Sequence, residues 1–356
     1  MTVPKPSFYT VFCTVLLCIF TIAFTHAQNL IPNPGFESTK PSVTKLTHEM
    51  QNFGKIKDWS ALVNSPDMFH PETARVNFKH KANNFLPQFG RQEPRTGEGK
   101  VGMYISGGIY KEGIVAKLDQ PLKAGKFYYF HMYVSLAEGV SKGCTSSIGS
   151  YFSSRKPRIT PTSKLKLHVE STEMLCDYQG WTKVCGVYKA KGTENYISLG
   201  YFGNNPKGRS LKSASGDMGN AYYFVDDVML LEMQVTQNLI PQDVCSMVLD
   251  FKDIEFLNGE SETDSVVEKE LDTYIQYVKL FKVDAIKVSG FANDAGSEFE
   301  NEIMASTRAL NVKKYFIDKG IDESLIEIVT AEEEDAMQTA DPETYNRVEV
   351  EIVAPK

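Results

Sequence analysis

Cysteine has the widest range of chemistry among the residues of this sequence, because it forms disulfides, binds zinc or acts as a nucleophile. Two of the six cysteines lie in an apolar N-terminal segment, which leaves Cys144, Cys176, Cys185 and Cys245. None of the spacings among these four has the C-x2–4-C form of a structural zinc site. Cys176 and Cys185 flank a predicted turn between two strands, so we expect them to face each other. Four cysteines allow three connectivities, and their spacing does not choose among them.

Histidine and acidic residues give little sign of catalysis. Beyond residue 27 the histidines are His48, His70, His80, His131 and His168. None of them lies in a recognisable motif with a serine or cysteine nucleophile. Pairs of acidic residues are plentiful, but glycosidase carboxylates are recognised by their separation in space, which a sequence does not reveal. We therefore expect a protein that is not an enzyme, with a hydrolase in the N-terminal half as an alternative.

The N-terminus has the pattern of an export signal. Lys5 supplies a weakly positive start, Phe8 to Phe24 is an apolar run, and Thr25-His-Ala27 has small residues at the two positions that a signal peptidase reads. We predict a signal peptide over residues 1–27, cleaved before Gln28. The alternative is an uncleaved membrane anchor, because the apolar run approaches the length that spans a bilayer. Export would permit disulfides among the remaining cysteines.

Length and charge indicate two domains with different partners. A chain of 356 residues exceeds the usual size of one domain. Residues 1–240 hold 27 Lys and Arg against 18 Asp and Glu, whereas residues 241–356 hold 11 against 27. Neither half has the basic, aromatic-interleaved pattern of a nucleic-acid-binding protein, so we expect no nucleic acid as a partner.

The acidic C-terminal part, predicted as residues 247–356, alternates strands and helices. Ala285 to Phe291 alternates as a strand does, and Ser297 to Lys319 reads as a helix with Ser297 as its N-cap. The whole series of predicted elements is a strand at 248–256, a helix at 262–282, the strand and helix just named, and strands at 326–329 and 347–353. This β-α-β-α-β-β order predicts an α+β fold.

Specific residues punctuate this series. They are Gly290-x-x-Asn293-x-x-Gly296, Asn301, Arg308-Ala309, Tyr315, Gly320-Ile321 and Asn346-Arg347-Val348-Glu349-Val350. Together they resemble the signature of OmpA-like peptidoglycan-binding domains. The resemblance implies a mixed sheet with both helices on one face. It also implies a ligand, the diaminopimelate residue of the peptidoglycan stem peptide.

The resemblance assigns five residues to the peptidoglycan site. Arg308 falls on the family's arginine, whose fork of donors suits a carboxylate, and Asn293 falls where the family has an aspartate for the ammonium group. Asparagine supplies no charge, and the adjacent Asp294 is a candidate substitute. Asn301 and Arg347 are weaker correspondences. The alternative is that Arg308 only braces the helix against a neighbouring glutamate, Glu300 or Glu349.

The N-terminal part, predicted as residues 28–234, reads as many short strands with Gly-, Pro- and Asn-rich turns. Clear examples of such strands are residues 125–134, 181–188, 196–202 and 222–231. Hardly any helical periodicity occurs, which predicts an all-β sandwich. The Gly97-x-Gly99-x-x-Gly102 run matches a dinucleotide-binding fingerprint in form, but no helical pattern follows it, so we reject that function.

Several segments of this half resemble jelly-roll carbohydrate-binding modules of the kind appended to xylanases and glucanases. They include Asn29-Leu-Ile-Pro-Asn-Pro-Gly-Phe-Glu37, Gly97 to Tyr104 and Tyr222 to Leu231. The resemblance implies a structural calcium ion held by Glu37 and by Asp226 or Asp227. The alternative is that these are ordinary surface acids beside a sheet edge. Trp59 and Trp181 are candidate sugar platforms, although tryptophans in a sandwich usually lie in the core.

These observations lead to one functional hypothesis. We expect an exported, non-enzymatic envelope protein that lies in the periplasm, in association with the cell wall and the outer membrane. Its C-terminal domain would bind peptidoglycan, and after a linker at residues 235–246 its sandwich would bind a glycan or an envelope protein. The first alternative is a structural or adhesion component whose OmpA-like domain has lost wall binding. The second is a wall-anchored carbohydrate-active enzyme.

Overall fold

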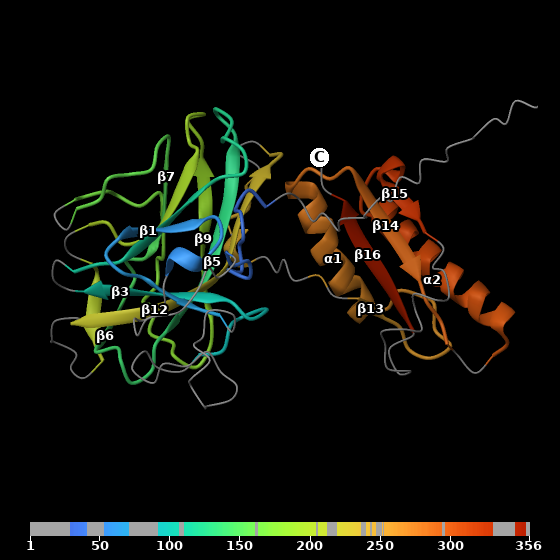
Figure 1. The fold of residues 1–356 in the computed structure, drawn as a ribbon. Helices are drawn as coiled ribbons and strands as arrows, with labels where there is room; N and C mark the ends of the chain where they lie inside the picture. The colour runs from blue at the N-terminus through green and yellow to red at the C-terminus, as the bar shows by residue number, and fades with distance from the viewer. Residues whose placement is uncertain are drawn as a thin grey trace, which may run out of the picture.

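The computed structural model of the chain describes residues 29–40, 53–70, 92–106, 110–160, 163–203, 206–211, 219–235, 240–242, 244–246, 251, 253–293, 296–329 and 346–353. The predicted signal peptide and its cleavage site lie outside these residues. Figure 1 shows an all-β part and an α+β part side by side. In the described part of the chain, no helix is both long enough and apolar enough to cross a membrane.

The N-terminal part is a sandwich of two five-stranded antiparallel sheets. One sheet has the order β1-β4-β10-β7-β8 and the other β2-β3-β12-β5-β9, with a separate β11-β6 pair. The strands are β1 (Trp59–Val63), β2 (Asp67–Phe69), β3 (Lys100–Ser106), β4 (Gly113–Lys117), β5 (Phe127–Leu136), β6 (Gly143–Thr145), β7 (Gly149–Ser153), β8 (Val169–Glu170), β9 (Thr182–Lys189), β10 (Tyr196–Gly200), β11 (Gly208–Ser210) and β12 (Asn220–Met233). Short 3-10 turns are η1 (Phe53–Lys55) before β1 and η5 (Val244–Ser246) after β12. The all-β jelly-roll prediction is confirmed.

The apolar core of the sandwich lies between the two sheets. Trp59 is 1% exposed and its ring packs 5.3 Å from that of Phe36. The Trp59 indole N–H donates to the carbonyls of Pro32 and Asn33, both at 3.1 Å. Trp59 is therefore a core residue, and the structure does not support its role as a sugar platform.

The C-terminal part has the predicted element order. It consists of β13 (Ile254–Glu255), α1 (Ser265–Leu280), β14 (Ala285–Gly290), α2 (Glu298–Asp318), η6 (Glu323–Leu325), β15 (Ile326–Ile328) and β16 (Arg347–Val353). The sheet order is β13-β16-β14-β15, in which only the β14–β15 pair is parallel. The two helices touch, because the Tyr315 hydroxyl lies 3.1 Å from Asp272 Oδ1. The mixed sheet is confirmed, but the first strand is shorter than predicted within the described residues.

Local sequence signals fix the ends of both helices. The Asp264 side chain accepts the N–H groups of Val266 and Val267 at the start of α1. At the start of α2, Ser297 and Glu300 form a capping box in which each side chain accepts the backbone N–H of the other. The predicted N-cap is therefore confirmed. Gly290 then lets α2 approach β14, since a Cβ there would collide with the carbonyl oxygen of Ala305.

The disulfides differ from the predicted pair. Cys144 bonds to Cys176, and Cys185 bonds to Cys245, so the predicted Cys176–Cys185 pairing is wrong. Side chains alternate along β9: Val184 enters the sandwich core, and Cys185 therefore lies on the outer face of its sheet. Cys176 precedes β9 in a segment that runs along β6, where the N–H of Leu175 donates to the carbonyl of Thr145 at 3.2 Å.

The two parts are joined by more than the chain between them. Tyr129 and Met233 on the outer face of the sandwich belong to the same apolar cluster as Phe281, which follows α1. Met233 forms an isolated β-bridge with Phe281. Gln234 donates its N–H to the carbonyl of Leu280 at 2.9 Å and its side-chain amide to that of Val278 at 2.8 Å. It thereby satisfies carbonyls at the C-terminal end of α1 that have no partner within the helix.

Candidate functional site

The strand β14 ends at the turn that carries the predicted peptidoglycan residues. Arg308 reaches this turn from α2, where its side chain is 0% exposed. It donates to three backbone carbonyls: from Nε to Glu260 at 2.8 Å, from Nη1 to Phe291 at 3.0 Å, and from Nη2 to Leu257 at 3.3 Å. The planar guanidinium fork thus joins β14 to the segment between β13 and α1.

Asn346 links Arg308 to Asn293. The Asn346 side-chain oxygen accepts from Arg308 Nη1 at 2.9 Å and from the N–H of Asn293 at 3.0 Å. Arg308 and Asn293 therefore meet in one network, with the Asn293 side chain exposed. Asp294 lies outside the described residues. Sequence reasoning named Asn346 only as part of the closing strand and missed its bridging place.

The two weaker candidates have structural partners. Arg347 contacts Glu349 Oε1 from Nε at 2.9 Å and lies 3.3 Å from Asp253, and its guanidinium stacks on Phe291 at 4.4 Å. Asn301 is half-buried on α2, and its backbone N–H donates to the carbonyl of Ser297 at 3.0 Å, as in a regular helix. Among the described contacts Arg308 is held by carbonyls, whereas Glu349 contacts Arg347 and Glu300 contacts Ser297. The predicted brace against Glu300 or Glu349 is therefore not what holds Arg308.

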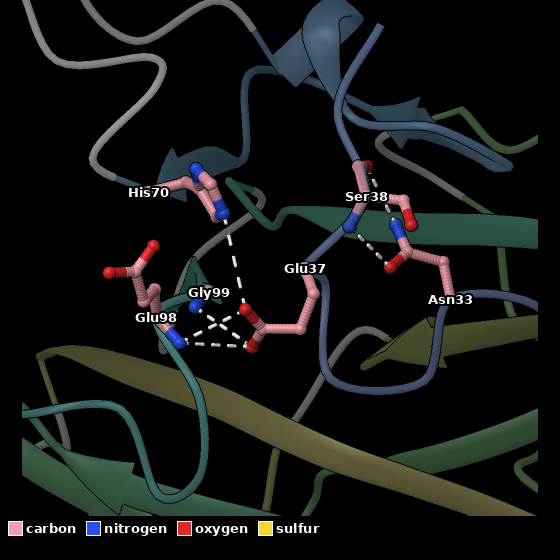
Figure 2. A network of polar contacts seen from close by, with 6 residues as sticks. All are labelled: Asn33, Glu37, Ser38, His70, Glu98 and Gly99. Carbon is pink, nitrogen blue, oxygen red and sulfur yellow. Dashed lines mark hydrogen bonds and ion pairs between the residues drawn. The ribbon is translucent and has the colours of Figure 1, made fainter.

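The three carboxylates predicted to hold calcium each have donors from the protein. Figure 2 shows Glu37, which accepts the N–H groups of Glu98 and Gly99, both at 3.0 Å, with His70 Nε2 at 4.0 Å. Asn33 holds the turn before it by accepting the N–H of Ser38 at 2.8 Å. Gly97 and Gly99 thus serve this close approach, since a Cβ at Gly97 would collide with the Glu37 carboxylate.

Arg95 contacts the other two acids, Asp226 through its backbone N–H and Asp227 through its guanidinium. Asp226 accepts the N–H of Arg95 and that of Asp227, both at 2.8 Å. Asp227 pairs with the Arg95 guanidinium at 2.6 Å and accepts the Thr96 hydroxyl at 2.6 Å. No group of three His, Cys, Asp or Glu in the described part of the chain is arranged to hold a metal. Calcium at Glu37, Asp226 and Asp227 stays a prediction: each carboxylate accepts protein N–H or O–H donors, and Asp227 also pairs with the Arg95 guanidinium.

A second polar cluster, which sequence reasoning missed, lies at one end of the sandwich. Glu112 is 2% exposed and accepts the Tyr110 hydroxyl at 2.7 Å and the N–H of Tyr104 at 2.8 Å. Asp67 is 5% exposed and accepts the Tyr222 hydroxyl at 2.7 Å. Tyr104 packs edge-on against Tyr110 and Tyr222, with ring centroids 6.4 and 4.7 Å away. We call Asp67, Tyr104, Tyr110 and Glu112 the tyrosine–carboxyl cluster.

Strand register builds this cluster. Asp67 on β2 lies opposite Gly102 on β3, and Gly102 lies opposite Phe224 on β12. A Cβ at Gly102 would collide with the Tyr222 hydroxyl, so the glycine makes room for Tyr222 to reach Asp67. Tyr110 remains 44% exposed, which leaves an aromatic ring at the surface beside two buried carboxyls.

Burial shifts the proton affinity of the carboxyls. It raises the pKa of Glu112 to about 7, with the charge of Asp67 acting in the same direction against the hydrogen bonds from Tyr110 and Tyr104. It raises the pKa of Asp67 to about 6 against the hydrogen bond from Tyr222. Burial beside Asp227 raises the pKa of Asp226 to about 8. These carboxyls hold protons in the folded protein at a pH where an unfolded chain has released them.

We expect the sandwich to lose stability between about pH 6.5 and 8. The folded state keeps protons on Glu112 up to about pH 7 and on Asp226 up to about pH 8. The stability that these raised pKa values confer is fully present below the pKa of the same carboxyls in the unfolded chain. It decreases above that pH and is lost once the pH has risen through the pKa of the folded state. Burial lowers the pKa of His131 from 6.5 to about 3, so its opposite effect is confined below about pH 6.5.

Thermal unfolding across this window measures the effect. Glu112→Gln, which resembles the protonated acid, should flatten the slope, whereas Glu170→Gln on the exposed end of β8 should leave it unchanged. Stability that rises between pH 6.5 and 8, or an equal slope in all three proteins, would contradict this expectation.

Comparison with known proteins places the C-terminal part in a family. The model of the OmpA family matches residues 256–349. None of the curated proteins matches the chain. The OmpA-like domain of FopA1 from Francisella tularensis is 24% identical, over 29% of this chain and 71% of that one, with a TM-score of 0.26. The peptidoglycan-associated lipoprotein of Burkholderia pseudomallei is 18% identical, over 29% and 88%, with a TM-score of 0.24.

The sandwich also has similar solved structures. The CBM22-1 xylan-binding domain of Xyn10C from Paenibacillus barcinonensis is 14% identical, over 59% of this chain and 97% of that one, with a TM-score of 0.34. Identities of this size say nothing about a ligand. The match of the C-terminal part to the OmpA family is more specific than these structural similarities, and it includes β14, α2 and the start of β16. Residues 256–349 of this chain are an OmpA family domain.

Proposed function

We propose that the protein is a non-enzymatic component of the cell envelope that binds peptidoglycan through its C-terminal domain and a glycan through its sandwich. The observation that carries the first part is the network at the end of β14, where Arg308 and Asn346 fix the backbone that presents Asn293. The match of residues 256–349 to the OmpA family supports it. Peptidoglycan lies in the periplasm, so the proposal includes export.

In this proposal the diaminopimelate residue of the stem peptide docks against the turn after β14. Asn293 is exposed there and offers an amide oxygen to the ligand's ammonium group. Arg308 acts as a positioning residue, because its guanidinium is buried and bonded to the carbonyls of the same turn. Arg308 also places a fixed positive charge beneath the turn after β14, which attracts the carboxylate of the diaminopimelate residue.

Asn293→Asp should strengthen binding to diaminopimelate-type peptidoglycan about tenfold, because a carboxylate makes a charge-assisted hydrogen bond where the amide makes a neutral one. Co-sedimentation of the full chain with purified peptidoglycan measures the change. Gln276→Glu, an equal charge change on the exposed face of α1, is the matched control and should have no effect. If the unaltered protein does not sediment with peptidoglycan at any concentration, the wall-binding proposal is wrong.

The tyrosine–carboxyl cluster is the proposed glycan site of the sandwich. Sugars stack on exposed aromatic rings and hydrogen-bond to polar groups at the ring edge, and the cluster offers the partly exposed Tyr110 beside the carboxyl of Glu112. A neutral sugar needs no counter-charge, which suits Glu112, because burial raises the pKa of this carboxyl to about 7 and so lowers its charge near neutral pH.

Tyr110→Ala should reduce affinity for the bound glycan about tenfold, because it removes the stacking ring. Tyr110→Phe keeps the ring and should retain most of the affinity, and Tyr178→Ala, another tyrosine exposed at 43%, should not change it. Binding of the full chain to a panel of β-linked plant and bacterial glycans is the measurement. An equal loss in all three variants, or no bound glycan, would overturn this site; turnover of a glycan would favour an enzyme instead.

A further inference from the structure

The N-terminal half of α2 stands out from the C-terminal domain. The buried residues of this helix are Arg308, Ala309, Val312, Tyr315 and Phe316, all in its second half. None of the first ten residues of α2 is buried, and in Figure 1 this end of the helix, shown in orange, points away from the sandwich. A helix of this kind is exposed to water on most of its circumference for nearly three turns.

Large apolar side chains lie on this exposed helix. Phe299 is 68% exposed, Ile303 51% and Leu310 55%. With the exposed Ser306 they follow steps of four, three and four residues, which place all four on one narrow stripe of the helix. We call Phe299, Ile303, Ser306 and Leu310 the α2 seam.

The spacing of the α2 seam is that of a helix-pairing surface. Alternating steps of four and three residues are the a and d positions of a heptad, the pattern with which one helix packs on another. The opposite face of α2, with Ala309 and Val312, is buried in the domain core. The core therefore accounts for one apolar face of the helix, whereas nothing in the described part of one copy accounts for the α2 seam.

Charge identifies a partner for this surface. The exposed acids Glu298 and Glu302 flank the seam at its N-terminal end, and Lys313 and the exposed Lys314 flank it at the C-terminal end. Lys313 also reaches Glu323, at 3.2 Å. A second α2 in antiparallel orientation sets the acidic end of one helix beside the basic end of the other, whereas a parallel helix sets like charges together. Small Ser306 near the middle allows close approach of the two helices.

We propose that the α2 seam binds the same seam of a second copy of this chain in an antiparallel helix pair. The contact is isologous, because each copy contributes the same residues and the two charge gradients are mutually complementary. One helix pair buries little area compared with an obligate dimer, so we expect a reversible dimer that forms at micromolar concentration. The proposal does not depend on peptidoglycan or glycan binding.

Sedimentation velocity of the full chain over a range of about 1 to 200 μM tests the pairing, with dimer expected in the upper part of this range. Ile303→Glu should raise the dissociation constant at least tenfold by placing a charge in the seam, and Glu302→Lys should weaken the dimer as well. Val266→Glu, at a residue of α1 that is 64% exposed, is the control and should not change it. Far-UV circular dichroism and the melting temperature check that each variant is folded.

Orientation has a separate test. Single-cysteine variants Ile303→Cys and Leu310→Cys, when mixed, should cross-link to each other faster than either does with itself, because antiparallel helices place these residues opposite one another. Cys144, Cys176, Cys185 and Cys245 are in disulfides, and both variants carry serine in place of Cys13 and Cys18 so that no other thiol competes in the cross-linking. A monomer at every concentration, a dimer that Ile303→Glu leaves intact, or faster cross-linking within each single variant would overturn the proposal. A folded monomer that Ile303→Glu destabilises would show that the same chain covers the seam.

Discussion

Arg308→Ala is expected to lower the free energy of unfolding of the C-terminal domain by about 3 kcal/mol or more, which is in the range measured when a buried hydrogen-bonded charge is removed. The substitution leaves the carbonyls of Leu257, Glu260 and Phe291 without their guanidinium donors. Each buried acceptor that loses its partner costs about 1–3 kcal/mol unless water enters. Arg308→Lys should recover only part of the loss, because one ammonium group cannot reach acceptors on three segments.

Denaturant unfolding followed by circular dichroism measures this change. Lys314→Ala, at an exposed position of the same helix, should alter stability by no more than about 0.5 kcal/mol. A loss of under about 1 kcal/mol for Arg308→Ala would mean that water replaces the guanidinium as donor to these carbonyls, and would contradict this expectation. The result also decides how binding data are interpreted, since loss of peptidoglycan binding in an unfolded Arg308→Ala variant says nothing about a site.

Removing the Cys185–Cys245 disulfide should separate the unfolding of the two parts of the protein. The bond joins β9 of the sandwich to η5, 60 residues away, and a loop of that length corresponds to about 4 kcal/mol of chain entropy in the unfolded state. With the bond intact, the disulfide together with the shared apolar cluster around Met233 and Phe281 should make the sandwich and the C-terminal domain unfold together. In the Cys185→Ala/Cys245→Ala variant we expect two transitions in place of one.

Differential scanning calorimetry resolves these transitions. The control is Cys144→Ala/Cys176→Ala, which removes a disulfide that closes a shorter loop, 32 residues, within the sandwich. It should destabilise the sandwich without splitting the transition. Gln234→Ala, which removes a cap from the end of α1, should shift the double-cysteine variant further toward two transitions. A single transition in the Cys185→Ala/Cys245→Ala variant would mean that the apolar contact alone couples the two parts.

The sequence determined the elements whose signals are local. Periodicity placed α1, β14, α2 and β16, because an amphipathic face repeats within a few residues of itself. The cap of α2 was predictable because Ser297 and Glu300 satisfy N–H groups three residues away. The alternation of apolar and polar residues along β5 and β12 likewise predicted the strands of a sandwich. These features need only neighbours along the chain.

The sites depended on contacts between distant segments, which only the tertiary structure decided. The role of Arg308 follows from carbonyls about 50 residues before it, and its partner Asn346 lies 38 residues after it. Arg95 reaches Asp227, one of the carboxylates that the sequence suggested as calcium ligands, across 132 residues. The cysteine pairing depends on the face of β9 on which Cys185 lies. The tyrosine–carboxyl cluster depends on the register of β2, β3 and β12. Such arrangements leave no periodic trace in the chain, because a side chain's type limits which partners it can bind but the packing of the folded chain selects among them.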